Sequence, residues 1–215
     1  MSQLSLFSAD LQAPHLADLA GLLAAHGQLT AGPERSEPGV VELSILLADG
    51  WRAQALLREC RVRDIPAETA AQDPADPTKS SSSTLPPAEP FPQTVLRTEQ
   101  SAMLSAMAVD WTASGGKSVP IDLILTAGLL RCWTIAAGRP ADVGFLLGLD
   151  PCAPDTHEPL AAACAAAGLA GSLLGVRGGG PAVRIVGYRR CSRLAEMIGT
   201  PPPEAPPGAF PKLGH

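Results

Sequence analysis

LAGLLAAHG, residues 19–27, is the stretch that decides the fold of this chain of 215 residues. It forms the core of a longer segment, residues 14–26, in which leucines recur at the interval that places side chains on one face of a helix. These leucines are Leu16, Leu19, Leu22 and Leu23. Gly27 follows as a typical C-terminal stop. The spacing predicts a helix over residues 14–26.

A second stretch of the same kind, LRCWTIAAG, stands at residues 130–138. It closes a long apolar segment that begins at Ile121 and reaches Ala137, and Gly138 follows at the end as Gly27 does in the first stretch. We expect a helix over residues 121–137. The chain therefore contains two related helices about one hundred residues apart in sequence.

The segments around each of these helices predict the same order of elements, which is helix, strand, helix, hairpin and helix. In the first half we expect helix 14–26, strand 40–47, helix 51–60, a hairpin of strands 61–65 and 94–98, and helix 101–109. In the second half we expect helix 121–137, strand 143–149, helix 158–167, a hairpin of strands 171–176 and 182–186, and helix 190–198. The repeated order indicates an α+β fold built as a pseudo-twofold pair of lobes.

Two segments interrupt this pattern. Residues 67–92 are rich in Pro, Ser, Ala and Asp, and such a composition cannot bury enough apolar surface to order the chain, so we expect a disordered linker or loop. The tail at residues 200–215 is Pro-rich, and we expect it to be disordered as well. The predicted first lobe is residues 1–66 and 93–114, and the second is residues 115–199.

Composition narrows the class of protein. Only 4% of residues are aromatic, which leaves little material for stacking bases on exposed rings. The five cysteines are scattered with no C-x-x-C pair, which is typical of reduced thiols in a cytosolic protein. There is no basic residue before Arg35, so we expect no secretory leader and a cytoplasmic location. Residues 159–176 are uncharged, but glycines interrupt them, so we expect no membrane span.

The stretch at 19–27 closely resembles the signature helix of the LAGLIDADG homing endonucleases, and it matches the family at Leu19, Ala20, Gly21, Leu22, Ala25 and Gly27. The resemblance implies that two such helices cross at the centre of a pseudo-dimer, where small residues let the backbones approach. We expect this lobe interface at Ala20, Gly21, Cys132 and Ala136.

In that family an acidic residue before the terminal glycine of each helix binds the divalent metals that drive phosphodiester cleavage. Here the two positions hold His26 and Ala137, so the carboxylates are missing. We therefore expect no nuclease activity, no metal site and no cofactor. The run Ser114–Ser118 (SGGKS) resembles the end of a phosphate-binding loop, but position 111 is Trp and no strand leads into the run, so we read it as a connector.

Element order in the second half most resembles the WhiA family of bacterial sporulation regulators, which keep the LAGLIDADG fold without nuclease chemistry. The likeness covers roughly residues 14–199 and includes the hairpin around VRGGGPAVRIVG. WhiA proteins continue into a helix-turn-helix, whereas this sequence has a Pro-rich tail there. DNA binding by that module therefore cannot be carried over.

Charge is unevenly distributed along the chain, whose formal net charge is −5. Residues 1–114 have seven basic and fourteen acidic residues, whereas residues 115–200 have eight basic and six acidic ones, so the second lobe is better suited to phosphates. In the LAGLIDADG fold the sheets form a saddle over DNA. The candidate DNA-binding residues are Arg61, Arg63, Arg97, Arg177 and Arg184 on the predicted strands and hairpin, together with Arg139; an equal alternative is that these arginines are ordinary solvated residues.

Two functions remain open from the sequence. The first is a non-catalytic transcription regulator that binds double-stranded DNA weakly through the saddle. The second is a protein-interaction module that binds a transcription factor or another regulator without contacting DNA. In that case we expect the partner to meet the acidic first lobe, which includes Glu34, Glu37, Glu42 and Asp49.

Overall fold

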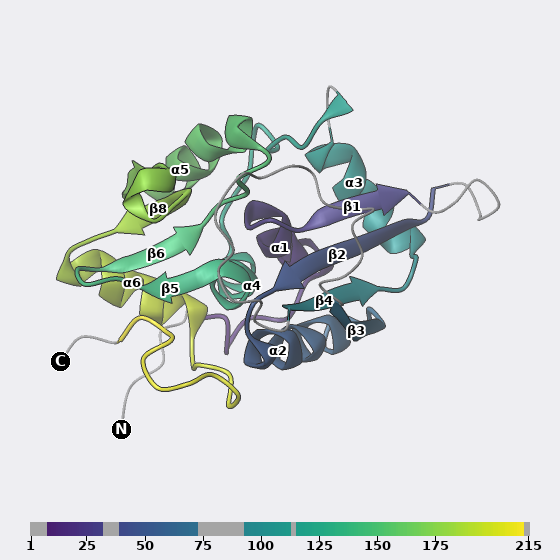
Figure 1. The fold of residues 1–215 in the computed structure, drawn as a ribbon, viewed down its shortest axis with the longest axis horizontal. Helices are drawn as coiled ribbons and strands as arrows, with labels where there is room; N and C mark the ends of the chain where they lie inside the picture. Colours follow the sequence, from purple (N-terminus) through teal and green to yellow (C-terminus); the bar gives the residue numbers. More distant parts are fainter. Residues whose placement is uncertain (1–7, 32–38, 73–92, 113–114, 213–215) are drawn as a thin grey trace.

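The computed structural model describes residues 8–31, 39–72, 93–112 and 115–212. Within these residues the fold is α+β, with two antiparallel sheets of four strands each. The strand orders are β1-β2-β4-β3 in the first sheet and β5-β6-β8-β7 in the second, so the two halves of the chain use the same arrangement. Figure 1 shows the two sheets on either side of a central pair of helices, α1 and α4.

The first half begins with a 3₁₀ turn that runs into a short helix. Its elements are η1 (Leu16–Leu19), α1 (Ala20–Ala24), β1 (Gln28–Ala31), β2 (Val41–Leu47), α2 (Gly50–Arg61), β3 (Ala67–Gln72), β4 (Gln93–Thr98), η3 (Ala102–Leu104) and α3 (Ser105–Trp111). The second half repeats the order. Its elements are α4 (Ala127–Ala137), β5 (Gly138–Pro140), β6 (Phe145–Gly148), η5 (Pro154–Thr156), α5 (His157–Ala166), β7 (Ser172–Leu174), η6 (Val176–Gly178), β8 (Ala182–Ile185) and α6 (Tyr188–Ile198).

The alternation of side chains in β2 shows how each sheet is oriented. Leu43, Ile45 and Leu47 are buried, whereas the residues between them are half-buried, so one face of the sheet packs on the core and the other faces outward. Both motif helices belong to the same core, and Leu22, Leu130 and Trp133 are fully buried there. The packing therefore joins the two halves into one apolar core.

Each half contains one more strand than the sequence predicts. β1 and β5 directly follow the two motif helices and pair antiparallel with β2 and β6, so the predicted single strand is a hairpin in both halves. Both are short edge strands whose sequences, QLTA and GRP, have little of the β-branched or alternating character that marks a strand. Their structure comes from hydrogen bonding to the neighbouring strand.

The prediction of a strand at residues 61–65 is wrong. Helix α2 continues to Arg61, and the chain then turns through Asp64, which adopts a left-handed backbone conformation (φ 56°) that aspartate tolerates better than most residues. The amide of Ile65 donates to the carbonyl of Cys60 and closes the helix end. The partner of β4 is instead β3, whose Thr69 pairs with Leu96.

The predicted linker therefore begins too early, because residues 67–72 form β3; residues 73–92 lie outside the described residues. The prediction of a disordered tail is also wrong for residues 200–212, which the structure describes. Phe210 is 6% exposed and its ring lies 6.3 Å from that of Trp51, centroid to centroid. Glu204 forms an ion pair with Arg58 on α2. The tail thus packs along the first half.

The second motif helix begins later than the apolar pattern predicts. Thr126 is its N-cap, and the Thr126 hydroxyl accepts a hydrogen bond from the amide of Leu129 at 3.0 Å. Residues 120–126 lead into the helix without joining it. In the part of the chain that the structure describes, no helix is long and apolar enough to cross a membrane.

Candidate functional site

The motif positions His26 and Ala137 stand at the C-terminal ends of the two central helices. His26 Nε2 donates a hydrogen bond to the carbonyl oxygen of Leu46 at 2.6 Å, which ties the ring to strand β2. Ala137 has only a methyl group and is the last residue of α4. Neither position supplies an oxygen ligand, so the chemistry at these helix ends depends on the residues around them.

A lysine lies against the C-terminal end of α1. Lys117 Nζ donates to the carbonyl of Gly27 at 3.0 Å and lies 2.7 Å from Oδ2 of Asp150, a residue that follows β6 in the second half. The side chains of Lys117 and Asp150 are 11% and 3% exposed. A cation is stabilised at this place because the last carbonyls of a helix carry partial negative charge.

Asp150 gathers further hydrogen bonds at the same place. Its Oδ2 also accepts from the Gln28 side chain of β1 at 3.0 Å, and its Oδ1 accepts from the amide of Cys152 at 2.9 Å. Burial lowers the pKa of Lys117 below its usual 10.5, while the hydrogen bond and the charge of Asp150 oppose that shift. The buried pair of Lys117 and Asp150 therefore joins the second half to the first through its hydrogen bonds with Gly27 and Gln28.

An arginine occupies the corresponding place at the end of α4. Arg52, on α2 of the first half, donates to the carbonyls of Ile135 at 2.6 Å and Gly138 at 2.7 Å. Its Nε also lies 2.9 Å from Oδ2 of Asp49, a carboxylate that is 51% exposed. Its guanidinium carbon lies 4.6 Å from the centre of the Trp51 ring. The end of the second-half helix is thus covered by a cation from the first half.

Both motif helices therefore end against a positive charge. Lys117 and Arg52 donate to the carbonyls of Gly27 and Gly138, each one residue past the motif positions His26 and Ala137. A divalent metal ion placed at either helix end would be repelled by the cation there. Among the described residues, no group of three or more His, Cys, Asp or Glu lies together in an arrangement that could hold a metal ion. The local chemistry is that of helix capping and ion pairing.

A second charge network lies at the opposite, N-terminal ends of the same helices. Arg63 is 3% exposed in its side chain and binds Asp18 at 2.9 Å and Glu59 at 2.7 Å. Arg131 on α4 binds the other oxygen of Glu59 at 2.7 Å, and Thr126 donates to Asp18 at 2.8 Å. These residues come from both halves of the chain, and the contacts of Glu59 with Arg131 and of Asp18 with Thr126 join the two halves.

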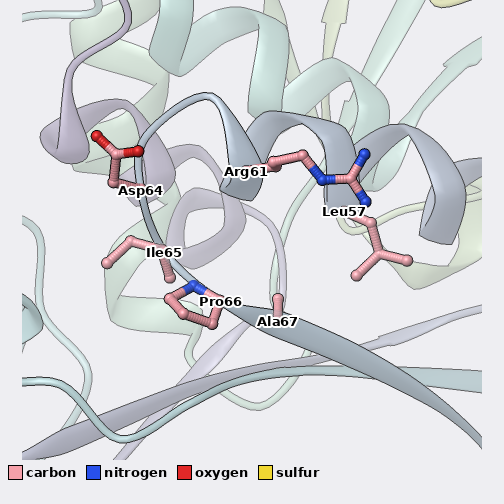
Figure 2. Close-up of a pocket in the computed structure, with 6 residues that line it drawn as sticks. All are labelled: Leu57, Arg61, Asp64, Ile65, Pro66 and Ala67. Carbon is pink, nitrogen blue, oxygen red and sulfur yellow. The ribbon is translucent and has the colours of Figure 1, made fainter.

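The side chain of Arg63 is thus held in a buried ion-pair network, and the prediction that it lies on an exposed strand is wrong. The prediction that Arg61 lies on a strand is also wrong, because Arg61 is the last residue of α2, where its side chain is exposed. Figure 2 shows its side chain extending along the helix toward Leu57 and away from Asp64. These residues border a shallow hollow of about 440 Å³ that Ile65, Pro66 and Ala67 complete.

The second sheet brings two of the predicted arginines onto one face. In the antiparallel register Arg139 stands opposite Leu146, and Leu146 stands opposite Arg184, so the two arginines lie on the same outer face. Arg177 is exposed in the turn between β7 and β8. A methyl group at Gly179 in that turn would lie 3.8 Å from a guanidinium nitrogen of Arg139, so Arg139 reaches toward the turn that carries Arg177.

The first sheet has a different charge pattern on the equivalent face. Arg97 on β4 stands opposite Ser44 and Glu68, and its guanidinium lies 3.9 Å from a carboxylate oxygen of Glu42. Arg97, the one arginine on the described strands of the first sheet, thus lies beside two acidic residues, Glu42 and Glu68. Strands β5 to β8, by contrast, contain no acidic residue. The basic surface of the predicted saddle is confined to the second half.

The predicted interface residues lie in the central core. At Gly21 a Cβ atom would fall 2.3 Å from the carbonyl oxygen of Leu129 and 2.8 Å from Cβ of Cys132, so glycine is required by the close approach of α1 and α4. Ala136 and Ala20 are each 4% exposed. Burial raises the pKa of the Cys132 thiol, and it raises that of Cys60 to about 12. All five cysteines are free thiols.

No protein-family model matches the chain, and no curated protein matches it either. The assignment of function therefore rests on the sequence motif and on the geometry described above. Sequence reasoning gave no site role to the groups at the C-terminal ends of the helices, Lys117, Asp150 and Arg52, or to those at the N-terminal ends, Asp18, Glu59 and Arg131. Each of them meets a partner that is remote in sequence, so no local pattern marks it.

Proposed function

We propose that this protein is a non-catalytic, DNA-associated transcription regulator of the cytoplasm, built as a pseudo-twofold pair of LAGLIDADG-like lobes. The observation that carries the proposal is the contrast between two places in the second half. Arg139 and Arg184 share the outer face of a sheet without an acidic strand residue, whereas a cation from the first half closes the end of α4. The first place attracts phosphates, and the second opposes metal binding.

The absence of nuclease chemistry in this proposal is supported by the charges at the helix ends. Hydrolysis of a phosphodiester by metal ions needs carboxylates that hold the metals near the scissile phosphate. At His26 and Ala137 the chain has no carboxylate, and Lys117 and Arg52 add positive charge beside them. Incubation of the protein with plasmid and Mg²⁺ or Mn²⁺ is expected to leave the plasmid intact. Cleavage that is lost in His26→Ala would overturn this part of the proposal.

The proposed DNA contact is weak and independent of sequence. Arginines on a sheet surface neutralise backbone phosphates, and contacts to phosphates position a protein without reading bases. Arg139, Arg177 and Arg184 provide a small patch, and the acidic residues beside Arg97 limit its extension across the first sheet. Because only a few phosphates are reached, log affinity against log salt should have a shallow slope, about −0.9 for each phosphate contacted.

Fluorescence anisotropy with a labelled duplex, measured across a salt series, tests this surface. The double variant Arg177→Ala with Arg184→Ala is expected to flatten the slope by about two contacts. The matched control is Arg58→Ala with Arg61→Ala, which removes the same charge from α2, off both sheets. The proposal fails if the two double variants weaken binding equally, or if the protein does not bind DNA at low salt.

The alternative function, a protein-interaction module, receives little support from the acidic residues that suggested it. Asp49 is paired with Arg52, and Glu42 lies near Arg97. Glu34 and Glu37 lie outside the described residues. A different surface favours this alternative. It lies between α3 of the first half and residues 120–126 of the second, and it combines exposed apolar side chains with carboxylates that have no partner among the described residues.

A further inference from the structure

Large apolar side chains are exposed around α3 and the segment that leads into α4. Ile121 is fully exposed, Ile124 is 79% exposed, Val109 is 74% exposed and Met103 is 54% exposed. Single exposed apolar residues are common on protein surfaces, but apolar residues gathered around a hollow mark a binding site. These exposed side chains therefore indicate a binding site only if some of them border a hollow.

Such a hollow, of about 300 Å³, lies between α3 and residues 120–126. Four of its lining residues are almost fully buried and form its apolar floor, and these are Ala20, Met107, Trp111 and Leu129. Met103 and Ile124 line it from the exposed side. The hollow has the size of the smaller ligand pockets, which is enough for a few aliphatic side chains.

Two carboxylates stand at the edge of this hollow. Asp110 on α3 and Asp122 in the approach to α4 both line it, and both are exposed. Within the described residues neither side chain has an ion-pair or hydrogen-bond partner. An apolar floor with two unpaired acidic groups on its border is complementary to an apolar surface flanked by basic residues.

We propose that this hollow binds an amphipathic helix of a partner protein, whose apolar face carries Leu, Ile or Met and whose edges carry Lys or Arg. The walls of the hollow are α3, the 120–126 segment and the N-terminal ends of η1 and α4, and none of its lining residues belongs to a strand. Binding therefore proceeds by insertion of side chains into a groove between helical segments and not by addition of a strand to a sheet edge.

Charge favours a different protein over a second copy of this chain. A symmetric dimer through this surface would bring the same patch of both copies together, so Asp110 and Asp122 of each copy would face the like charges of the other. DNA is disfavoured for the same reason. A basic helix, by contrast, pairs with both carboxylates while its apolar side chains cover Met103 and Ile124.

The docking surface and the arginine surface lie on different parts of the fold. The hollow is lined by α3 and the N-terminal ends of the central helices, whereas Arg139, Arg177 and Arg184 lie on the second sheet and its turn. This inference gives the protein-interaction alternative a site and a partner class. It rests on that alternative and not on DNA binding, so an experiment without DNA tests it separately.

The test uses a labelled synthetic peptide of about five helical turns, with Leu and Met on one face and Lys and Arg along its edges. Binding to the full chain is followed by fluorescence anisotropy. We expect Ile124→Asp to weaken binding by about tenfold or more, because it places a charge among the apolar contacts. Asp110→Asn with Asp122→Asn should weaken binding several-fold and reduce its dependence on salt.

The matched control is Val62→Asp, which places the same charge at an exposed valine just after the end of α2, outside the lining of the hollow, and should leave the affinity unchanged. All the substituted residues are exposed, so the fold is expected to persist in each variant, and circular dichroism checks this. The proposal is overturned if the protein does not bind the peptide, if a scrambled peptide or one with Glu for Lys and Arg binds equally, or if Val62→Asp weakens binding as much as Ile124→Asp. Self-association of the wild type in sedimentation that Ile124→Asp abolishes would assign the hollow to a second copy instead.

Discussion

The ends of the two central helices are closed by cations in different ways. At the end of α1, Lys117 is buried with a buried carboxylate, Asp150, and donates to the carbonyl of Gly27. At the end of α4, Arg52 spreads its donors over the carbonyls of Ile135 and Gly138, and its carboxylate partner is half exposed. Arginine has five donors and can satisfy several carbonyls alone, whereas a lysine nitrogen is a compact charge that relies on its partner when buried.

We infer from this difference that the aspartate contributes more to stability at the end of α1 than at the end of α4. Asp150 is held in place by four groups, the side chains of Lys117 and Gln28, the amide of Cys152 and the ring of His157, which donates to the Asp150 carbonyl at 2.7 Å. Asp49 has Arg52 as its partner and is exposed to water. The first end is therefore a buried network and the second a partly solvated one, and stability measurements can separate them.

The largest effect is expected from removing the lysine. Lys117→Met leaves Asp150 charged and buried without a cation, which costs about 3–5 kcal/mol of unfolding free energy. Arg52→Met should cost less, about 1–3 kcal/mol, because water can solvate Asp49. Urea titrations followed by circular dichroism measure both. Adding Asp150→Asn to Lys117→Met should restore part of the loss, and equal losses in the two single variants would remove the distinction between the ends.

Alkaline pH acts on the first helix end through Lys117, whose pKa is lowered by burial from 10.5. Burial raises the pKa of Cys60 and Cys164 to about 12 each and also raises that of Cys132, so these thiols stay neutral in the fold while the unfolded chain ionises them above 9.0. Each thiol then lowers stability, by a slope that approaches about 1.4 kcal/mol per pH unit. Lys117 acts with the opposite sign between its lowered pKa and 10.5, because there the unfolded chain holds the proton more tightly.

The three buried thiols lower the unfolding free energy by more than Lys117 raises it. We therefore expect stability to fall above about pH 9, by about 3 kcal/mol over the first one to two pH units. Lys117→Met should fall more steeply than the wild type, and Arg52→Met should fall in parallel with the wild type. Cys164→Ala removes one of the three thiols and should reduce the slope of stability against pH by up to about 1.4 kcal/mol per pH unit. Denaturant titrations at a series of pH values measure these slopes, and a stability that stays constant up to pH 10.5 would show that the thiols are not buried as described.

The comparison also requires that α1 and α4 pack closely. Gly21→Ala places a Cβ atom within 2.3 Å of a backbone oxygen of Leu129, which cannot move without shifting the helix. We expect a loss of about 1–3 kcal/mol, although alanine favours helix over glycine. Gly116→Ala is the control, because a Cβ there meets open space. Thermal melts in which both variants behave alike would contradict the close approach.

The smallest effect is expected at the exposed carboxylate. Asp49→Asn removes a surface ion pair with Arg52 and should cost less than about 1 kcal/mol, whereas Asp150→Asn should cost clearly more because its charge is buried beside Lys117. The same urea titrations serve here. A loss at Asp49 as large as the loss at Asp150 would mean that the arginine also depends on its aspartate.

The sequence predicts the elements whose periodicity follows from burial. Strand β2, helix α6 and the C-terminal end of helix α4 are predicted to within two residues, because their apolar residues recur at the interval of a strand or a helix. The start of α4 is predicted too early. Strands β1, β5 and β3 are missed or mistaken for loop, because their pairing with a neighbour, and not their own composition, makes them strands. The relation to the LAGLIDADG proteins stays a prediction.

The candidate site is less predictable than the fold. Arg184 lies on a sheet as expected, because its strand is read from local sequence, whereas Arg139 lies on β5, a strand that the sequence does not predict. Arg63 is misplaced because its position depends on Asp18, which is distant in sequence and meets it only in the folded core. Lys117 is noticed only as part of a glycine-rich run, and the carboxylate that explains it stands 33 residues away. Pairing between distant residues has no local signature.

The positive charges at the helix ends bear on whether a metal site could arise there. Aspartates introduced at positions 26 and 137 would stand beside Lys117 and Arg52, so each new carboxylate would form an ion pair in place of a metal site. Removing the cations first would leave Asp150 unpaired in the core. Four coordinated substitutions are thus needed, and the single steps toward them lower stability or gain nothing. In evolutionary terms the helix caps act as a barrier to the gain of a metal site at these two positions.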